Sequence, residues 1–286
     1  SERNGKTFST TFNFEGANTV GALDASQFAK YVLVEENATL TAPAGFDVTT
    51  TVEGLDVLYE DGTYKLGIKK AYVAQIGEQG YETLAAAIDA ANTGDTITLL
   101  ADVTEDVTVD KKVTIEGADF SYTGMMKVNS GLTVTVQNVN FVNGCIDKVK
   151  GTTGTLTVKN CTFDGTGSNY YYAITMRGGN KVVVEDCQSK GFVYGFLYIP
   201  KAVTDVSVKN VAVTECVMGI NVTYGNKVNL EDVTMTDVGY GIQSHNYGAK
   251  TFTMNNCDIS GEYAIFACER TENAVVDTFV FQGTGN

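Results

Sequence analysis

The stretch KNCTF, residues 159–163, joins a charged residue, an asparagine and a small apolar residue that is followed two places later by a phenylalanine. Related stretches occur on both sides of it: QNVNF at 137–141, EDCQS at 185–189, KNVAV at 209–213, EDVTM at 231–235 and NNCDI at 255–259. The copies begin with the apolar residues Val134, Leu156, Val182, Val206, Val228, Phe252 and Ala274, at spacings of 22 to 26 residues. A period in the low twenties, with alternating apolar residues inside each copy, is typical of a solenoid whose repeats stack their strands.

The fifth residue of each copy carries an amide or a carboxylate in all copies but the last: Asn138, Asn160, Asp186, Asn210, Asp232 and Asn256, then Thr278. Asn and Asp tolerate a left-handed backbone and hydrogen-bond to nearby main chain, so they suit a sharp bend. We therefore expect a ladder of these residues at one corner of every coil. The next residue turns into the core, namely Val139, Cys161, Cys187, Val211, Val233, Cys257 and Phe279, and so do Phe141, Phe163, Val213, Met235, Ile259 and Phe281 two places further on.

The residue before each corner faces solvent and alternates in charge along the solenoid. Lys159 would lie beside Glu185, and Lys209 beside Glu231, because neighbouring coils are about 4.8 Å apart. Exposed pairs of this kind contribute about 0.2–1 kcal/mol. We interpret them as devices for register and solubility. Asp186 and Asp232 are possible calcium ligands, but as corner residues two coils apart they are interpreted as structural.

A second strand in each coil is indicated by a recurring small residue that precedes an Ile or Phe. Its copies are Tyr172-Ala173-Ile174, Tyr194-Gly195-Phe196, Met218-Gly219-Ile220, Tyr240-Gly241-Ile242 and Tyr263-Ala264-Ile265, at spacings of 22 to 24 residues. The small residue permits a tight bend, and the Ile or Phe enters the core. Both strands repeat in phase, which predicts a parallel β-helix.

With its repeated strands, asparagine ladder and Gly-Ile strand starts, the chain resembles right-handed parallel β-helix proteins of the pectate lyase-like kind, over roughly residues 95–286. The resemblance implies the fold. It says little about activity, because this architecture hosts lyases, hydrolases, adhesins and phage tail parts.

The segment YVAQIGEQGYETLAAAIDAANTGDTITLLADVT, from residue 72 onward, resembles a segment that opens β-helices in surface proteins of gut-type Gram-positive bacteria. Tyr81, Leu84, Ile88 and Ala91 fall on one helical face, and Gly94 ends the helix. We expect a short amphipathic helix over about 81–92 that caps the open end of the solenoid.

Residues 1–75 lack the repeat and are predicted to form a small β-rich domain with a role in attachment or assembly, ahead of a β-helix domain over 76–286. FDVTTTV and LDVLYEDGTYKLGI read as a hairpin about Asp61-Gly62, and DASQFAKYV at 24–32 reads as a short helix. The fold class is therefore all-β apart from these helices.

Composition narrows the partners. The 34 Asp and Glu residues against 20 Lys and Arg give a net charge of −14, which disfavours nucleic acid and anionic lipid. No apolar run reaches the ~18 residues of a membrane span. No secretion signal is visible; it has been removed, or else Ser1 follows an excised initiator Met, which would favour a virion protein. The expected localisation is extracellular, on a bacterial surface or a phage particle.

Catalytic and metal sites are not predicted. Arg177 and His245, the one histidine, share an outward column but lie three coils, about 14 Å, apart. That separation is too large for one reaction centre. No Asp or Glu is assigned to this strand except Glu269, so the paired carboxylates of glycoside hydrolysis are missing. The six cysteines show no C-x-x-C and no partnering histidine, so we expect buried free thiols and no metal or other cofactor.

The same outward column mixes apolar and polar residues, predicted as Thr175, Leu197, Asn221, Gln243 and Phe266, with Arg177, Ile199, Thr223, His245 and Cys268 beside them. Either the loop SNYYY at 168–172 covers these side chains, or they form a contact surface. The second alternative is a glycan- or protein-binding face, helped by Tyr198, or the interface of a homo-oligomer such as a trimer. The candidate binding residues are Tyr170, Tyr171, Arg177, Leu197, Ile199, Asn221, Gln243, His245 and Phe266.

These patterns favour a non-enzymatic structural or adhesive β-helix that binds glycan or protein partners. The alternative is a polysaccharide lyase or glycoside hydrolase that acts on acidic polysaccharide.

Overall fold

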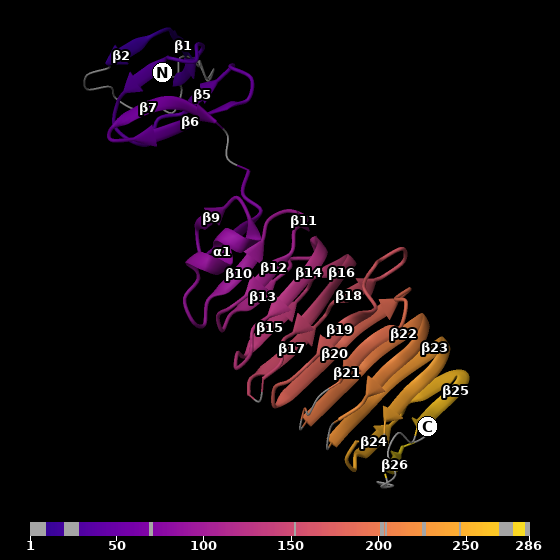
Figure 1. The fold of residues 1–286 in the computed structure, drawn as a ribbon. Coiled ribbons are helices and arrows are strands. Elements are labelled where there is room, and N and C mark those ends of the chain that lie inside the picture. Colours follow the sequence, from indigo (N-terminus) through magenta and orange to yellow (C-terminus); the bar gives the residue numbers. More distant parts are fainter. Residues whose placement is uncertain are drawn as a thin grey trace. The chain divides into compact units, whose positions relative to one another are not determined.

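A computed structural model (Figure 1) describes residues 10–19, 29–68, 71–151, 153–200, 203, 205–224, 227–245, 247–268 and 277–283. The chain divides into two compact units, residues 1–71 and 72–286. Strands make up 62% of the structure, and α1 is its one helix among the described residues.

The N-terminal unit contains two small sheets. A three-stranded parallel sheet has the order β1 (Thr10–Phe14), β3 (Ala29–Leu33), β5 (Val48–Thr50), and a four-stranded sheet has the order β2 (Ala17–Thr19), β4 (Thr39–Thr41), β7 (Thr63–Ile68), β6 (Leu55–Glu60). The predicted hairpin is confirmed: β6 and β7 pair antiparallel about Asp61 and Gly62, whose φ angles are 49° and 76°. Two successive positive φ values give the twist that a tight hairpin needs.

The short helix predicted over residues 24–32 is wrong where it can be compared. Residues 24–28 lie outside the described residues, and 29–32 belong to strand β3. Tyr31 and Leu33 alternate into the small core of this unit, together with Leu40 and Tyr64. This period of two, and pairing with both β1 and β5, outweighs the helical propensity of the segment.

The second unit begins with a cap. Strands β8 (Ala74–Ile76) and β9 (Gln79–Tyr81) form a hairpin, and β8 pairs antiparallel with the first long-period strand, β10 (Thr96–Leu99). Helix α1 (Leu84–Ala90) follows, shorter than predicted because Tyr81 is in β9. The Thr83 hydroxyl accepts a hydrogen bond from the Ala86 amide and so starts the helix, whose Leu84, Ala87 and Ile88 are buried.

The rest of the unit is a parallel β-solenoid of about 10 turns, which Figure 1 shows as rows of stacked arrows. Its further strands are β11 (Val103–Thr104), β12 (Val107–Val109), β13 (Thr114–Glu116), β14 (Ser121–Val128), β15 (Val134–Gln137), β16 (Asn140–Lys148), β17 (Thr155–Lys159), β18 (Thr162–Asp164), β19 (Tyr172–Met176), β20 (Lys181–Lys190), β21 (Gly195–Ile199), β22 (Asp205–Val222), β23 (Lys227–His245), β24 (Thr251–Asn255), β25 (Asp258–Cys268) and β26 (Thr278–Gln282).

The predicted corner ladder is confirmed from 138 to 256. All six residues have φ between 49° and 55°, and Asn210 Nδ2 donates to Asp186 Oδ1 on the coil before it at 2.6 Å. The inward column after the corner is buried over the same coils, from Val139 to Cys257. The expected ion pairs also form between neighbouring coils: Lys159 Nζ lies 2.7 Å from Glu185, and Lys209 Nζ lies 2.8 Å from Glu231.

The last coil departs from the prediction. Phe252 pairs with Phe279, not with Ala274, which lies outside the described residues. Thr278 therefore pairs with Thr251 and is not a corner residue, and Phe281 is 55% exposed instead of buried. A stack between Phe252 and Phe279, with ring centroids 4.7 Å apart and an angle of 6°, decides this register, because it extends the aromatic core by one coil.

Candidate functional site

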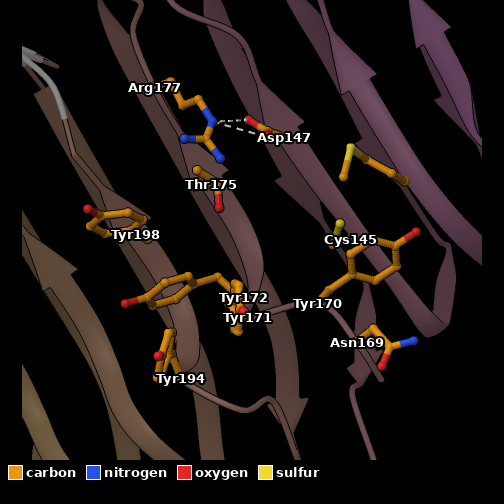
Figure 2. Close-up of a pocket in the computed structure, with 11 residues that line it drawn as sticks. Cys145, Asp147, Asn169, Tyr170, Tyr171, Tyr172, Thr175, Arg177, Tyr194 and Tyr198 are labelled. Carbon is orange, nitrogen blue, oxygen red and sulfur yellow. Dashed lines mark hydrogen bonds and ion pairs between the residues drawn. The ribbon is translucent and has the colours of Figure 1, made fainter. Parts of the chain in front are cut away.

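A groove of about 430 Å³ lies on the outward face of the second-strand column, in the coils formed by β16, β19 and β21 (Figure 2). Its lining residues are Met125, Cys145, Asp147, Asn169, Tyr170, Tyr171, Tyr172, Thr175, Arg177, Tyr194 and Tyr198. Strand register builds its floor, since Asp147, Thr175 and Tyr198 occupy the same outward position on three successive coils.

The loop before β19 builds one wall. The Ser168 amide donates to the Gly165 carbonyl at 2.8 Å, and the Tyr170 amide donates to the Ser168 hydroxyl at 3.1 Å, so the loop is turned tightly. The Tyr170 hydroxyl reaches Asp106 Oδ1 at 3.3 Å, and its ring packs against the core. The SNYYY loop is thus part of a groove on the outward face.

Stacked tyrosines dominate the groove. Tyr171 and Tyr194 have ring centroids 4.8 Å apart at 21°, and Tyr172 and Tyr198 have centroids 4.7 Å apart at 19°. Each stack joins one coil to the next. Tyr171 is 59% exposed and Tyr194 is 42% exposed. The groove therefore offers flat apolar ring surface with hydroxyls at the rim.

An ion pair closes one end of the groove. Arg177 Nε lies 2.9 Å and 3.1 Å from the two carboxylate oxygens of Asp147, one coil away. Figure 2 shows the two terminal guanidinium nitrogens on the other side of the group, near Thr175. The expectation that no carboxylate accompanies this column is wrong, because Asp147 occupies it one coil before Thr175.

Burial keeps the acidic groups of the groove neutral. It raises the pKa of Tyr172 to about 12 and that of the Cys145 thiol to about 12, with Asp147 and Asp106 adding to the effect on Cys145. Burial and the nearby Asp106 also raise the pKa of Tyr170. A general base works best with a pKa near the working pH. These phenols and this thiol therefore act as hydrogen-bonding groups and not as bases or nucleophiles at neutral pH.

The structure brings three predicted binding residues into the groove: Tyr170, Tyr171 and Arg177. Tyr198, also expected to help, lines it as well. Sequence reasoning missed Cys145, Asp147, Tyr172 and Tyr194 as groove residues. The signal for Asp147 was present, since continuing the outward column back by one coil reaches it.

Two predicted residues face the wrong way. Leu197 and Ile199 are 0% exposed and lie in the core, so they cannot touch a ligand. Gly195, not Tyr194, aligns with Tyr172 and Met218, and this places Leu197 beside Ile174 and Ile220. A slip of one residue exchanges the two faces of a strand, and apolar burial selects the register with Leu and Ile inside. Tyr198 takes the outward position instead.

The remaining predicted residues lie further along the solenoid. Asn221 Nδ2 donates to Gln243 Oε1 at 2.8 Å and to the Tyr172 hydroxyl at 3.3 Å, so this amide pair borders the tyrosines. Phe266 packs against Tyr240 and Tyr263, with ring centroids 5.0 Å and 5.8 Å away.

His245 has a partner that the sequence analysis denied. Its Nδ1 lies 2.8 Å from Cys268 Sγ, and His245 and Cys268 are opposite each other in β23 and β25. The expectation that no cysteine has a partnering histidine is therefore wrong. All six cysteines are free thiols as predicted, but Cys216 and Cys268 are only half-buried.

Among the described residues, no group of three or more His, Cys, Asp or Glu side chains is placed to hold a metal ion. Within the same residues, no helix has the length and apolar character needed to cross a membrane. Comparison of the chain with protein-family models, with curated proteins and with solved structures gave no match.

Proposed function

We propose that this chain is a non-enzymatic adhesive β-solenoid that binds a glycan in the tyrosine groove. The observation that carries the proposal is the pair of stacked, exposed rings Tyr171 and Tyr194 next to the Arg177–Asp147 ion pair. Apolar surface with a few fixed polar groups is the usual construction of a small-molecule site.

Sugars match both parts of this groove. The apolar C–H face of a pyranose ring packs on a flat aromatic ring, and its hydroxyls need donors and acceptors at the rim. The terminal nitrogens of Arg177 supply donors, and Asp147 and the tyrosine hydroxyls supply acceptors. Because Arg177 is fixed by Asp147, less side-chain entropy is lost on binding.

Charge favours an uncharged sugar over an acidic one. The Arg177–Asp147 pair has no net charge, Asp106 lies beside Tyr170, and the whole chain carries −14. An anionic ligand would be repelled at long range. We therefore propose neutral hexose units as the ligand.

We further propose that the protein is displayed outside the cell, on a bacterial surface or a phage particle. Support comes from the stacked architecture, in which core columns and a corner ladder repeat with little variation and give a stiff scaffold. A protein partner, or a homo-oligomer such as a trimer, would use the same outward face.

The test is a screen of the intact chain against immobilised neutral and uronate-containing oligosaccharides. Tyr171→Ala/Tyr194→Ala removes the exposed ring surface and should abolish binding. Tyr263→Ala is the matched control, since Tyr263 is 46% exposed and stacks on Tyr240 outside the groove. Equal glycan binding by the wild type and the double variant would contradict the proposal, as would the absence of any glycan ligand.

The Arg177–Asp147 pair also favours one second candidate, a polysaccharide lyase that acts on acidic polysaccharide. Release of unsaturated uronate, lost in Arg177→Ala, would establish it. The raised pKa values of Tyr170 and Tyr172 weigh against this candidate, because neither phenol would be ionised to take a proton.

A further inference from the structure

A second pair of reactive groups lies away from the groove, at the ends of β23 and β25. His245 Nδ1 and Cys268 Sγ are 2.8 Å apart on neighbouring coils. His245 is 6% exposed and Cys268 is half-buried, so the imidazole is shielded while the thiol remains within reach of solvent. Three coil steps, about 14 Å, separate His245 from Arg177 of the groove.

A buried network fixes the backbone at His245. Lys250, itself fully buried, donates from Nζ to the His245 carbonyl at 2.5 Å, and its Nζ lies 3.3 Å from Asp277 Oδ1. The hydroxyl of the neighbouring Ser244 bonds to Asp277 Oδ2 at 2.5 Å. The imidazole is therefore presented to Cys268 from a rigid position.

The other cysteines have different surroundings. Cys161, Cys187 and Cys216 direct their sulfur atoms at backbone carbonyl oxygens. Burial raises the pKa of Cys216 to about 12, so that thiol stays protonated. The chain has one histidine, so no other cysteine can have an imidazole base.

We propose that Cys268 is a nucleophilic thiol, with His245 as its base, that exchanges with external disulfides. In this step Nδ1 takes the Sγ proton and the thiolate attacks one sulfur of R–S–S–R′. The new S–S bond forms as the old one breaks, and the leaving thiolate takes the proton back from the imidazolium. One thiol and one disulfide enter and one of each leaves, so no other oxidant or reductant is needed.

A disulfide is the substrate class that these two groups suit. Thiol–disulfide exchange needs a thiolate and access to it. Acyl transfer would in addition need donors to stabilise an oxyanion, and the described residues provide none that are directed at Cys268. The outward column holds Thr223 and His245 on the preceding coils, not a second cysteine that could resolve the product. The mixed disulfide would therefore persist, as a reversible covalent attachment to a disulfide-bearing partner.

The test uses oxidised glutathione on the intact reduced chain, with quenching, digestion and mass measurement of each cysteine peptide over time. Cys216 is the matched control, being the other half-buried free thiol. Cys268 should gain glutathione at least about tenfold faster than Cys216, and His245→Gln should slow Cys268 by a similar factor without changing Cys216.

Modification of Cys268 no faster than that of Cys216 would overturn the proposal. So would an unchanged Cys268 rate in His245→Gln while the buried Cys161 and Cys187 stay unmodified, which reports that the variant is folded. If those two thiols become reactive, His245→Asn is the replacement variant, and the wild-type ratio of Cys268 to Cys216 still decides.

Discussion

Replacing Gly195 with alanine tests the register that forms the groove. Gly195 lies between Tyr194 and the core strand, opposite Tyr172 and Met218. An added Cβ would be 1.8 Å from the Met218 carbonyl oxygen, whereas ordinary contact begins at 3.4 Å, so the two coils must separate locally by the difference, 1.6 Å. The obstacle is backbone, which cannot rotate away as a side chain does.

The cost follows from the hydrogen bonds at that step of the ladder. The Gly195 amide donates to the Tyr171 carbonyl at 3.0 Å, and the Met218 amide donates to the Tyr194 carbonyl at 2.5 Å. Losing both costs about 1–3 kcal/mol in the free energy of unfolding. For a unit of this size, about 2–4 °C is lost per kcal/mol, so the melting temperature should fall by about 2–12 °C.

Calorimetry of Gly195→Ala measures this loss, and glycan binding should weaken with it because Tyr171 and Tyr194 lie on the two coils that separate. Gly167→Ala is the comparison: its added Cβ has nothing within 4 Å, and only the positive φ of 78° opposes it, at about 1–2 kcal/mol. Wild-type stability in Gly195→Ala would refute the placement of Gly195 opposite Met218.

Two further predictions concern the corner and a buried lysine. Asn210→Ala should lower the free energy of unfolding by about 1–2 kcal/mol, because alanine is strained at φ 49°; Asn210→Gly should cost less, and urea titration that ranks them the other way would contradict the corner assignment. Burial lowers the pKa of Lys148, whose Nζ donates to the carbonyls of Asn129 and Leu132. The unfolded chain then binds more protons between that lowered pKa and 10.5, so wild-type stability relative to Lys148→Met should rise with pH through that window. A difference that stays flat or falls between neutral pH and pH ~10 would show that the lysine is not desolvated.

The solenoid could be predicted because its constraints act on residue type. A left-handed corner accepts Asn, Asp or Gly, so the column from Asn138 to Asn256 is visible as a period in the sequence. The same reasoning failed at the last coil, where Ala274 and Phe279 both begin apolar segments and no later copy exists to choose between them. There, aromatic packing on Phe252 decided the register.

The groove was only partly predictable, for two physical reasons. The loop that carries Tyr170 and Tyr171 has no period, so the direction of its side chains depends on contacts such as that with Asp106. The position of Leu197 depended on a one-residue offset between Gly195 and its neighbours, which the aromatic-small-aliphatic pattern had aligned differently. In both cases local pattern was ambiguous and burial settled the outcome.

The two candidate sites share a cause in the architecture. In a stacked solenoid, inward columns and corners fix the fold, so each outward position can change without altering the register. The outward column that begins at Asp147 and Thr175 contributes an ion pair and tyrosines at one end and ends near the Cys268–His245 pair at the other. Since exchange at Cys268 requires neither ring stacking nor Arg177, removing the tyrosines should leave glutathione exchange intact, and His245→Gln should leave glycan binding intact. Loss of both activities in either variant would mean that the two ends are not independent, and that the column acts as one contact surface.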